Sequence, residues 1–288
     1  MKTKIKTAVL PIAGLGTRFL PLSKVIPKEF FPLGSKPVIQ YIVEEALEAG
    51  AEKIIFVISP EKKEIFEKYI LKYFKEDSDL LSILKKRKKQ EAIEALNSIP
   101  KIDWEYTIQK KPLGDGDAIL KAEKFVNSGP FLVLFGDDIS YNPGGPSMAV
   151  QLVKAFEKIQ KTILCFYKMP KERLSSYGVP KVKKIRADQC KSNTNIYKIE
   201  DLVEKPKENP PSRFACVGKW LLTPEIFYYL KKTKSQNGEI LLANALRDML
   251  KDEKEIFGIE AQGKWLECGT KESWMESFLY LAKNSKNR

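Results

Sequence analysis

Short apolar segments alternate with amphipathic ones along the first half of the chain, and this alternation constrains the fold more than any other feature. Segments typical of buried strands occupy residues 6–10, 53–58, 104–108 and 131–135, and two more follow at 162–167 and 214–220. Patterns typical of helices occupy residues 37–49, 61–74, 79–98 and 117–126. Strands that alternate with helices predict an α/β fold around a mainly parallel sheet.

The pattern becomes less regular after about residue 177. Further strands are predicted at residues 182–185 and 196–204, and further helices at 224–232, 239–250 and 271–282. The chain contains no internal repeat and no low-complexity linker, and its 288 residues are enough for one large core. We therefore expect a single domain over residues 1–288, with the later part folded back over the open edge of the sheet.

The amino-acid composition excludes several kinds of site. The chain has no histidine, which excludes the triads, metal sites and general bases that depend on imidazole. Its four cysteines form no C-x-x-C pair, which argues against a structural zinc site and favours a reduced, cytoplasmic protein. No apolar run approaches the ~20 residues that a membrane span needs, so we expect no membrane association.

The net charge of +13 raises nucleic-acid binding as a hypothesis. The basic residues are scattered, however, and the one dense run, residues 85–89, lies in the middle of a predicted helix without interleaved aromatic side chains. A solvated helix face explains such a run better than a nucleic-acid site. We therefore expect no nucleic-acid partner, although the positive field would modestly favour anionic substrates.

A glycine-rich loop follows the first predicted strand. It contains Gly14 and Gly16, and the cations Arg18 and Lys28 come shortly after. Backbone N–H groups in a glycine turn bind anions, and neighbouring cations neutralise phosphate oxygens. The loop lacks the third glycine of a dinucleotide fingerprint, because Phe19 stands there, and no Gly-Lys-Ser/Thr completes a P-loop. The loop therefore predicts a nucleoside triphosphate site of a different kind.

Polar residues at the ends of other predicted strands could complete such a site. Asp137 follows the apolar strand at 131–135, where a carboxylate either holds Mg²⁺ or caps the next turn. Gln109 precedes a second glycine loop, and its amide, which can donate and accept together, suits the edge of a pyrimidine base. Glu204 and Lys205 are either a surface ion pair or ligands for sugar hydroxyls and a sugar phosphate. Glu267 is either a second metal ligand or part of a helix approach.

These elements are consistent with one reaction. When a sugar phosphate attacks the α-phosphate of a nucleotide, the nucleophile is already an anion and needs no general base. A protein without histidine can therefore catalyse this reaction by positioning the substrates and neutralising charge with Mg²⁺, Arg and Lys. Pyrophosphate would leave in line with the attacking oxygen.

The order and spacing of these elements resemble the bacterial UTP–glucose-1-phosphate uridylyltransferases, within the sugar nucleotidyltransferase superfamily. The resemblance rests on Gly14-Leu-Gly-Thr-Arg18 and Pro27-Lys28-Glu29, and it extends over nearly the whole chain. Residues 39–45 and the helical segment near 79–89 are similar to the uridylyl branch. The resemblance implies a Rossmann-like α/β/α sandwich with a mixed, mainly parallel sheet, Mg²⁺ as cofactor, and a homodimer or homotetramer.

The resemblance also implies roles for individual residues. UMP would pass from UTP to glucose 1-phosphate, with the nucleotide bound by about residues 1–140 and the sugar phosphate by about 141–288. The implied catalytic residues are Arg18 and Lys28, and the implied metal ligands are Asp137 and Glu267. The implied nucleotide-binding residues are Ala13, Gly14, Leu15, Gly16, Thr17, Glu29, Gln109 and Gly114. The implied sugar-phosphate residues are Gly178, Glu204, Lys205, Val217 and Gly218, with Tyr177 beside them.

The chain departs from the family pattern at several positions. Glu267 stands where Asp is common, Asp117 stands where His is usual, and Asp115 replaces an apolar residue. Residues 239–244 replace a pattern richer in Gln, Thr and Asp. Two alternatives therefore stay open: an enzyme that uses dTTP or another sugar 1-phosphate, and a non-catalytic paralogue that regulates a partner. Thymine and uracil differ by one methyl group, worth only ~1–3 kcal/mol in a close-fitting pocket.

Overall fold

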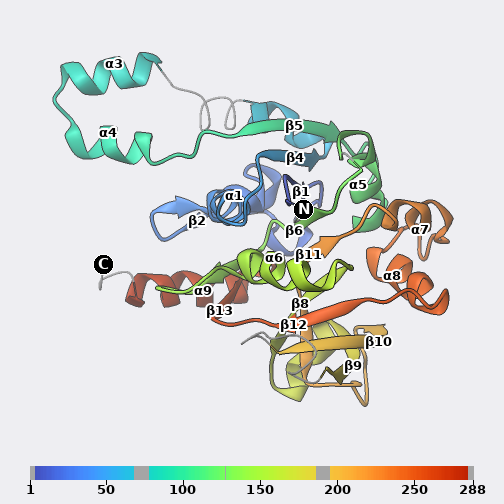
Figure 1. Ribbon diagram of the computed structural model, residues 1–288. Coiled ribbons are helices and arrows are strands. Elements are labelled where there is room, and N and C mark those ends of the chain that lie inside the picture. The colour runs from blue at the N-terminus through green and yellow to red at the C-terminus, as the bar shows by residue number, and fades with distance from the viewer. Residues whose placement is uncertain (1–3, 68–77, 127, 186–194, 285–288) are drawn as a thin grey trace.

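A nine-stranded mixed sheet forms the centre of the computed structural model, which describes residues 4–67, 78–126, 128–185 and 195–284 (Figure 1). In spatial order the strands are β5 (Asp103–Ile108), β4 (Lys53–Ile58), β1 (Thr7–Pro11), β6 (Phe131–Leu134), β11 (Phe214–Leu222), β8 (Ile163–Lys168), β12 (Phe257–Glu260), β10 (Ile196–Glu204) and β9 (Gly178–Lys184). Seven of the nine strands run in one direction, and only β11 and β10 oppose them. The predicted mixed, mainly parallel sheet is confirmed.

Helices cover both faces of this sheet. Helices α1 (Val38–Glu48) and α6 (Met148–Ile159) pack on one face, and α5 (Asp115–Lys121), α7 (Ile226–Lys232) and α8 (Leu242–Lys251) pack on the other (Figure 1). Successive residues of a strand point to opposite faces, so Leu10 of β1 joins the first apolar cluster and Val9 joins the second. This two-sided core confirms the predicted α/β/α sandwich and explains why the central strands are continuously apolar.

Strands β5, β4, β1 and β6 are parallel neighbours, so their carboxyl ends lie along one edge of the sheet. The loops that follow β1, β5 and β6 therefore meet at this edge, where ligands of open α/β sheets bind. All four strands were predicted to within one residue at each end.

The later part of the chain differs from the prediction. It does not fold over an open edge; instead β11, β8, β12, β10 and β9 extend the same sheet beyond β6. The sequence patterns also did not predict a separate two-stranded sheet of β7 (Asp138–Tyr141) and β13 (Lys264–Glu267), which precedes helix α9 (Lys271–Asn284). Both strands contain only four residues, and their pairing joins segments more than a hundred residues apart.

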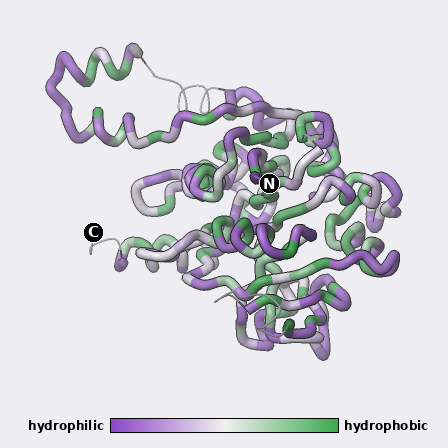
Figure 2. Tube along the Cα trace, in the orientation of Figure 1, coloured by the Kyte–Doolittle hydropathy of each residue, from purple (hydrophilic) through white to green (hydrophobic). Residues whose placement is uncertain are grey.

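The predicted helix at 79–98 is in fact two helices, α3 (Ser78–Lys86) and α4 (Gln90–Asn97). The chain reverses between them, with Lys88 in the left-handed region at φ 54°. The basic run at 85–89 therefore spans the last two residues of α3 and the turn after it, rather than the middle of a helix. The two helices project away from the β5 edge of the sheet, and hydrophilic and hydrophobic residues alternate along them (Figures 1 and 2). Much of the predicted helix at 61–74 lies outside the described residues.

Candidate active site

The glycine loop after β1 forms one wall of a cavity of about 560 Å³ at the carboxyl edge of the sheet. The loop turns sharply because Ser23 Oγ donates a 2.7 Å hydrogen bond to the carbonyl of Gly16, and the buried Phe19 anchors it to the core. The predicted residues that line the cavity are Ala13, Gly14, Leu15, Thr17, Arg18, Lys28, Glu29, Gln109, Gly114 and Asp137. The structure thus brings together residues from the loops after β1, β5 and β6, while Gly16 shapes the turn without lining the cavity.

Gln109 lines the same cavity as Arg18 and comes directly after β5 in the sequence. Its Nε2 donates to the carbonyl of Gly114 and to Oδ2 of Asp117, both at 2.9 Å. Both hydrogens of the amide are thus used within the protein in this structure, and the predicted role of Gln109 at the edge of a base stays a prediction. Only its carbonyl oxygen is free of these two bonds.

Gly114 has to be glycine in this structure. Its φ is +94°, and a Cβ atom there would lie 2.5 Å from the carbonyl oxygen of Ile240. The same segment brings Glu239 and Leu241 into the lining of the cavity, which the sequence patterns did not predict. It is held in place because Ile240 N–H donates to Leu113 and Gly116 N–H donates back to Ile240.

Lys28 and Asp137 form an ion pair in the cavity wall, with Nζ 2.5 Å from Oδ2. Burial alone would raise the pKa of Asp137, but the charge and hydrogen bond of Lys28, together with Arg18, hold that pKa below its usual value. Burial likewise opposes the charged form of Lys28, yet Asp137 and Glu29 raise the pKa of the ammonium. Both groups are therefore charged at neutral pH.

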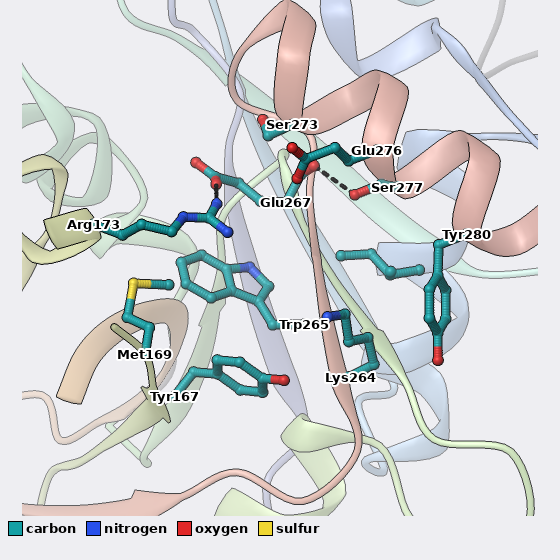
Figure 3. A pocket seen from close by; sticks show the side chains of 11 residues that line it. Tyr167, Met169, Arg173, Lys264, Trp265, Glu267, Ser273, Glu276, Ser277 and Tyr280 are labelled. Carbon is teal, nitrogen blue, oxygen red and sulfur yellow. Dashed lines mark hydrogen bonds and ion pairs between the residues drawn. The ribbon is translucent and has the colours of Figure 1, made fainter. Parts of the chain in front are cut away.

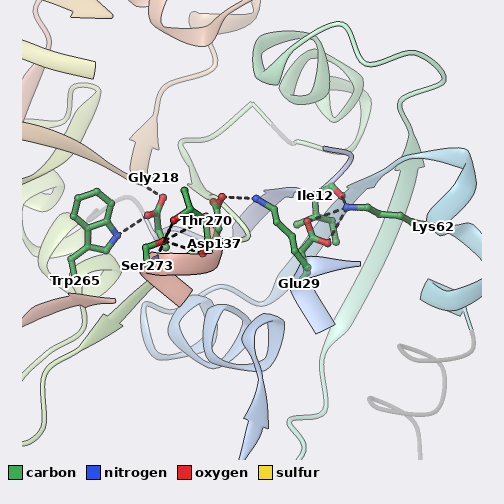
Figure 4. A network of polar contacts seen from close by, with 10 residues as sticks. Ile12, Glu29, Lys62, Asp137, Gly218, Trp265, Thr270 and Ser273 are labelled. Carbon is green, nitrogen blue, oxygen red and sulfur yellow. Dashed lines mark hydrogen bonds and ion pairs between the residues drawn. The ribbon is translucent and has the colours of Figure 1, made fainter. Parts of the chain in front are cut away.

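Glu29 is buried, and its carboxylate is bound by Lys62 (Figure 4). Lys62 Nζ donates to both carboxylate oxygens, at 3.0 and 2.9 Å, and to the carbonyl of Ile12 at 2.7 Å. These bonds tie the segment that carries Lys28 to the end of β1. Lys62 was not predicted as a site residue, because nothing in its local sequence shows that it is buried.

Glu267 approaches Asp137 because β13 pairs with β7, which places Glu267 opposite Asp138. Tyr177 donates a 2.6 Å hydrogen bond to Oε2 of Glu267, and Arg173 lies 3.8 Å from the same oxygen. Burial is the main reason why the pKa of Glu267 is raised. Glu267, Arg173 and Trp265 are among the residues that line a small cavity of about 170 Å³, and Figure 3 shows their side chains.

Asp137, Glu267 and Arg18 converge on Gly269. A Cβ atom on this glycine would lie 3.2 Å from Asp137 Oδ2, 3.5 Å from Glu267 Oε1 and 3.7 Å from Arg18 Nη1. The backbone N–H of Cys268 donates to the carbonyl of Asp137 at 2.6 Å, which fixes the two loops together.

Asp138 has a different environment from its neighbour Asp137. It accepts hydrogen bonds from the Trp265 indole at 2.6 Å and from the N–H of Gly218 at 3.0 Å (Figure 4). Burial, with the negative charge of Asp137 next, raises the pKa of Asp138 to about 7. Its oxygens are used inside the protein, so Asp138 supports the loops around the cavity, whereas Asp137 lines the cavity.

A second cavity, of about 700 Å³, adjoins this centre and shares Arg18 with the first. Lys205, Tyr177 and Glu267 also line it. Lys205 reaches it because β10 pairs with β9, which places Glu204 opposite Gly178. Glu204 and Lys205 are both exposed and 3.3 Å apart, which is the predicted surface pair. Lys205 lines this cavity and Glu204 lines neither cavity, so a sugar-binding role of Glu204 stays a prediction.

Val217 and Gly218 lie behind Asp138 rather than in the lining of either cavity. The Val217 side chain is fully buried, and its carbonyl accepts a bond from the Trp220 indole. A Cβ atom on Gly218 would lie 2.2 Å from Asp138 Oδ2, so only glycine allows that carboxylate its position. The role of these two residues in sugar binding remains a prediction.

The described residues contain no cluster of three or more metal-ligating side chains. Mg²⁺ in phosphoryl-transfer sites is commonly held by one or two carboxylates, with waters and substrate phosphates supplying the other ligands. Two neighbouring carboxylates at the cavity wall fit this requirement, and Asp137 and Glu267, which converge on Gly269, are the pair that could supply them. The three described cysteines are free, and in the parts of the chain that the structure describes no helix is long and apolar enough to cross a membrane.

Comparison with known proteins agrees with this architecture. A family model described as nucleotidyl transferase matches residues 7–284. A UTP–glucose-1-phosphate uridylyltransferase of Streptococcus pyogenes serotype M3 is 36% identical over 284 residues, which cover 97% of this chain and 91% of that protein.

Two solved structures extend the comparison. A UDP-glucose pyrophosphorylase complexed with UDP-glucose superposes with a TM-score of 0.83 at 35% identity, covering 97% of this chain and 99% of the other. A UTP-bound UGPase from Acinetobacter baumannii superposes with a TM-score of 0.83 at 31% identity, covering 96% and 93% of the two chains. The chain therefore belongs to the nucleotidyl transferase family, among the bacterial UTP–glucose-1-phosphate uridylyltransferases.

Proposed function

We propose that this protein transfers UMP from UTP to glucose 1-phosphate and releases pyrophosphate, with Mg²⁺ as cofactor. The observation that carries the proposal is the continuity of the site. A cavity lined by the glycine loop and Gln109 meets a cavity lined by Lys205, and Arg18 borders both. The full-length similarity to uridylyltransferases, with solved relatives bound to UTP and to UDP-glucose, supports the choice of substrates.

The side chains divide the work according to their positions. The glycine loop, which lines the first cavity with Gln109, would offer backbone N–H groups to the triphosphate, and Gln109 would face the base. Arg18, at the junction of the two cavities, would stabilise charge on the α-phosphate and on departing pyrophosphate. Lys28 would exchange Asp137 for a phosphate oxygen when the nucleotide binds. Lys205 would bind the phosphate of the sugar, which attacks as an anion and needs no general base.

Asp137 and Glu267 would hold the cofactor. When bound, Mg²⁺ supplies neutralising charge to the phosphates of the substrate. We also propose a cytoplasmic homodimer or homotetramer with a single domain, in which the nucleotide part precedes about residue 140.

A matrix of nucleotides and sugar 1-phosphates tests this function. Pyrophosphate release is measured for UTP, dTTP and CTP, each with glucose 1-phosphate and with galactose 1-phosphate, and with and without Mg²⁺. The expected maximum is UTP with glucose 1-phosphate, and no release is expected without the metal. A preference for dTTP or for another sugar would overturn the substrate assignment. Binding of UDP-glucose without turnover of any pair would instead favour the regulatory paralogue.

A further inference from the structure

Asp117 contacts Gln109, the residue that is proposed above to face the nucleotide base. Asp117 and Gln109 are only 4% and 5% exposed as whole residues, and Asp117 Oδ2 lies 2.9 Å from Gln109 Nε2. Gln109 Nε2 also lies 2.9 Å from the carbonyl of Gly114. An amide group has two hydrogens, so these two contacts use both of them.

The chemistry of the two partners fixes which way the amide points. A carboxylate and a backbone carbonyl can only accept hydrogen bonds. If the Gln109 amide were rotated by half a turn, its own oxygen would face two acceptors in a buried place, and an unsatisfied buried polar group costs about 1–3 kcal/mol. A histidine or an asparagine at position 117 could donate, so the rotated orientation would then be opposed only by the carbonyl of Gly114.

We propose that Asp117 is a positioning residue that makes Gln109 an acceptor toward the base, and so selects a base with an N–H group at ring position 3. Uracil and thymine carry that hydrogen, whereas cytosine presents a lone pair at the same ring atom. Cytosine would therefore place an acceptor opposite the acceptor oxygen of Gln109, and this oxygen would be left unpaired. The inference rests on the proposed function, since it takes the cavity of Gln109 as the base pocket.

The chain offers a matched control for this proposal. The other carboxylate oxygen of Asp117 lies 3.3 Å from Nζ of Lys121, one helical turn further along α5. Lys121→Met removes that ion pair and leaves the Asp117–Gln109 bond in place. It therefore separates the effect of the bond from any effect of the charge around Asp117.

The test compares UTP with CTP. The kcat/KM for each nucleotide is measured with glucose 1-phosphate for the wild type, Asp117→Asn, Lys121→Met, Gln109→Ala and the double variant Gln109→Ala/Asp117→Asn. The wild type should prefer UTP by at least about a hundredfold, and Asp117→Asn should lower that preference by about tenfold. Lys121→Met should leave it within about twofold. The double variant should show the preference of Gln109→Ala alone, because Asp117 acts through Gln109.

Three results would overturn the proposal. In the first, Asp117→Asn lowers the rates with UTP and CTP by the same factor, which is the signature of a merely structural role. In the second, the wild type does not prefer UTP. In the third, Gln109→Ala lowers kcat/KM for UTP and for CTP by the same factor. This third comparison tests the proposal even when the Asp117→Asn protein does not fold. Equilibrium binding of UTP and CTP, measured by calorimetry on the same proteins, tests the proposal even if no nucleotide is turned over and the proposed function fails.

Discussion

Nζ of Lys28 lies 2.5 Å from Oδ2 of Asp137, although 109 positions separate the two residues in the sequence. The proposed phosphate-binding cation thus neutralises the proposed metal ligand when no substrate is present. Neither charge is left unpaired in a partly buried wall, where an isolated charge would be costly. Binding of a metal–nucleotide complex would replace this pair by two new ones, Lys28 with phosphate and Asp137 with metal.

Lys28→Met should lower kcat by at least about a hundredfold, because a cation that stabilises departing charge is lost. It should also destabilise the free protein by about 2 kcal/mol at pH 7, since Asp137 loses its partner. Lys28 holds the pKa of Asp137 in the folded protein below its usual value. The ion pair therefore stabilises the protein fully above the unfolded pKa of Asp137, and this stabilisation is lost as the pH falls through the folded pKa. Urea unfolding at pH 7 and pH 3 measures this loss, which should shrink at the lower pH because pH 3 lies below the unfolded pKa of about 3.9. Lys24→Met, an exposed lysine of the same loop, should change neither property.

Glu267→Gln should raise the Mg²⁺ concentration needed for half-maximal rate by about tenfold, because a neutral amide is a weaker ligand for a hard cation. Glu267→Asp keeps the charge and should stay within a few-fold of the wild type. Tyr177→Phe removes the 2.6 Å hydrogen bond to Glu267 and serves as the control for lost support. A rate whose Mg²⁺ dependence is the same for Glu267→Gln and the wild type would exclude Glu267 as a metal ligand.

Asp115 gives a pH-dependent prediction. It accepts bonds from the N–H groups of Gly116 and Leu242, yet burial raises its pKa to about 6. A raised carboxyl pKa means that the folded state binds the proton more tightly than the unfolded state does. The contribution of protonated Asp115 to stability is therefore complete below the unfolded pKa and is lost as the pH rises through about 6. Asp115→Asn keeps the acceptor oxygen and avoids that loss. At pH 7 its free energy of unfolding, measured in urea, should exceed that of the wild type by about 1–2 kcal/mol. This difference should vanish near pH 4.

The parallel half of the fold could be predicted because its signals are local. Apolar strands such as β4 and the glycine loop beside Arg18 can each be recognised within ten residues of sequence. Asp137 was predicted for the same reason, since it ends an apolar strand. The site residues that were missed depend on contacts between distant segments. Lys62 is an ordinary polar residue until the fold places it against Glu29. Asp138 acquires the Trp265 donor only when β13 pairs with β7, and it acquires the Gly218 donor from β11.

Lys219 is a further case of this kind, because it is fully buried in β11 with Nζ 2.8 Å from Oε2 of Glu45. Among the described residues neither atom has a well-oriented hydrogen bond, so the pair is held by charge. The other oxygen of Glu45 accepts a bond from the N–H of Ala149 at 3.0 Å.

Lys219→Met should therefore cost about 3–5 kcal/mol of unfolding free energy, because it leaves a buried carboxylate without a counter-charge. The double variant Lys219→Met/Glu45→Gln should recover much of this loss, since the amide removes the charge and can still accept from Ala149. Lys231→Met breaks an exposed pair with Glu123 and should cost less than about 1 kcal/mol. Urea unfolding of the four proteins at pH 7 measures these differences. A double variant no more stable than Lys219→Met would show that the loss comes from altered packing around Lys219, not from an unpaired Glu45.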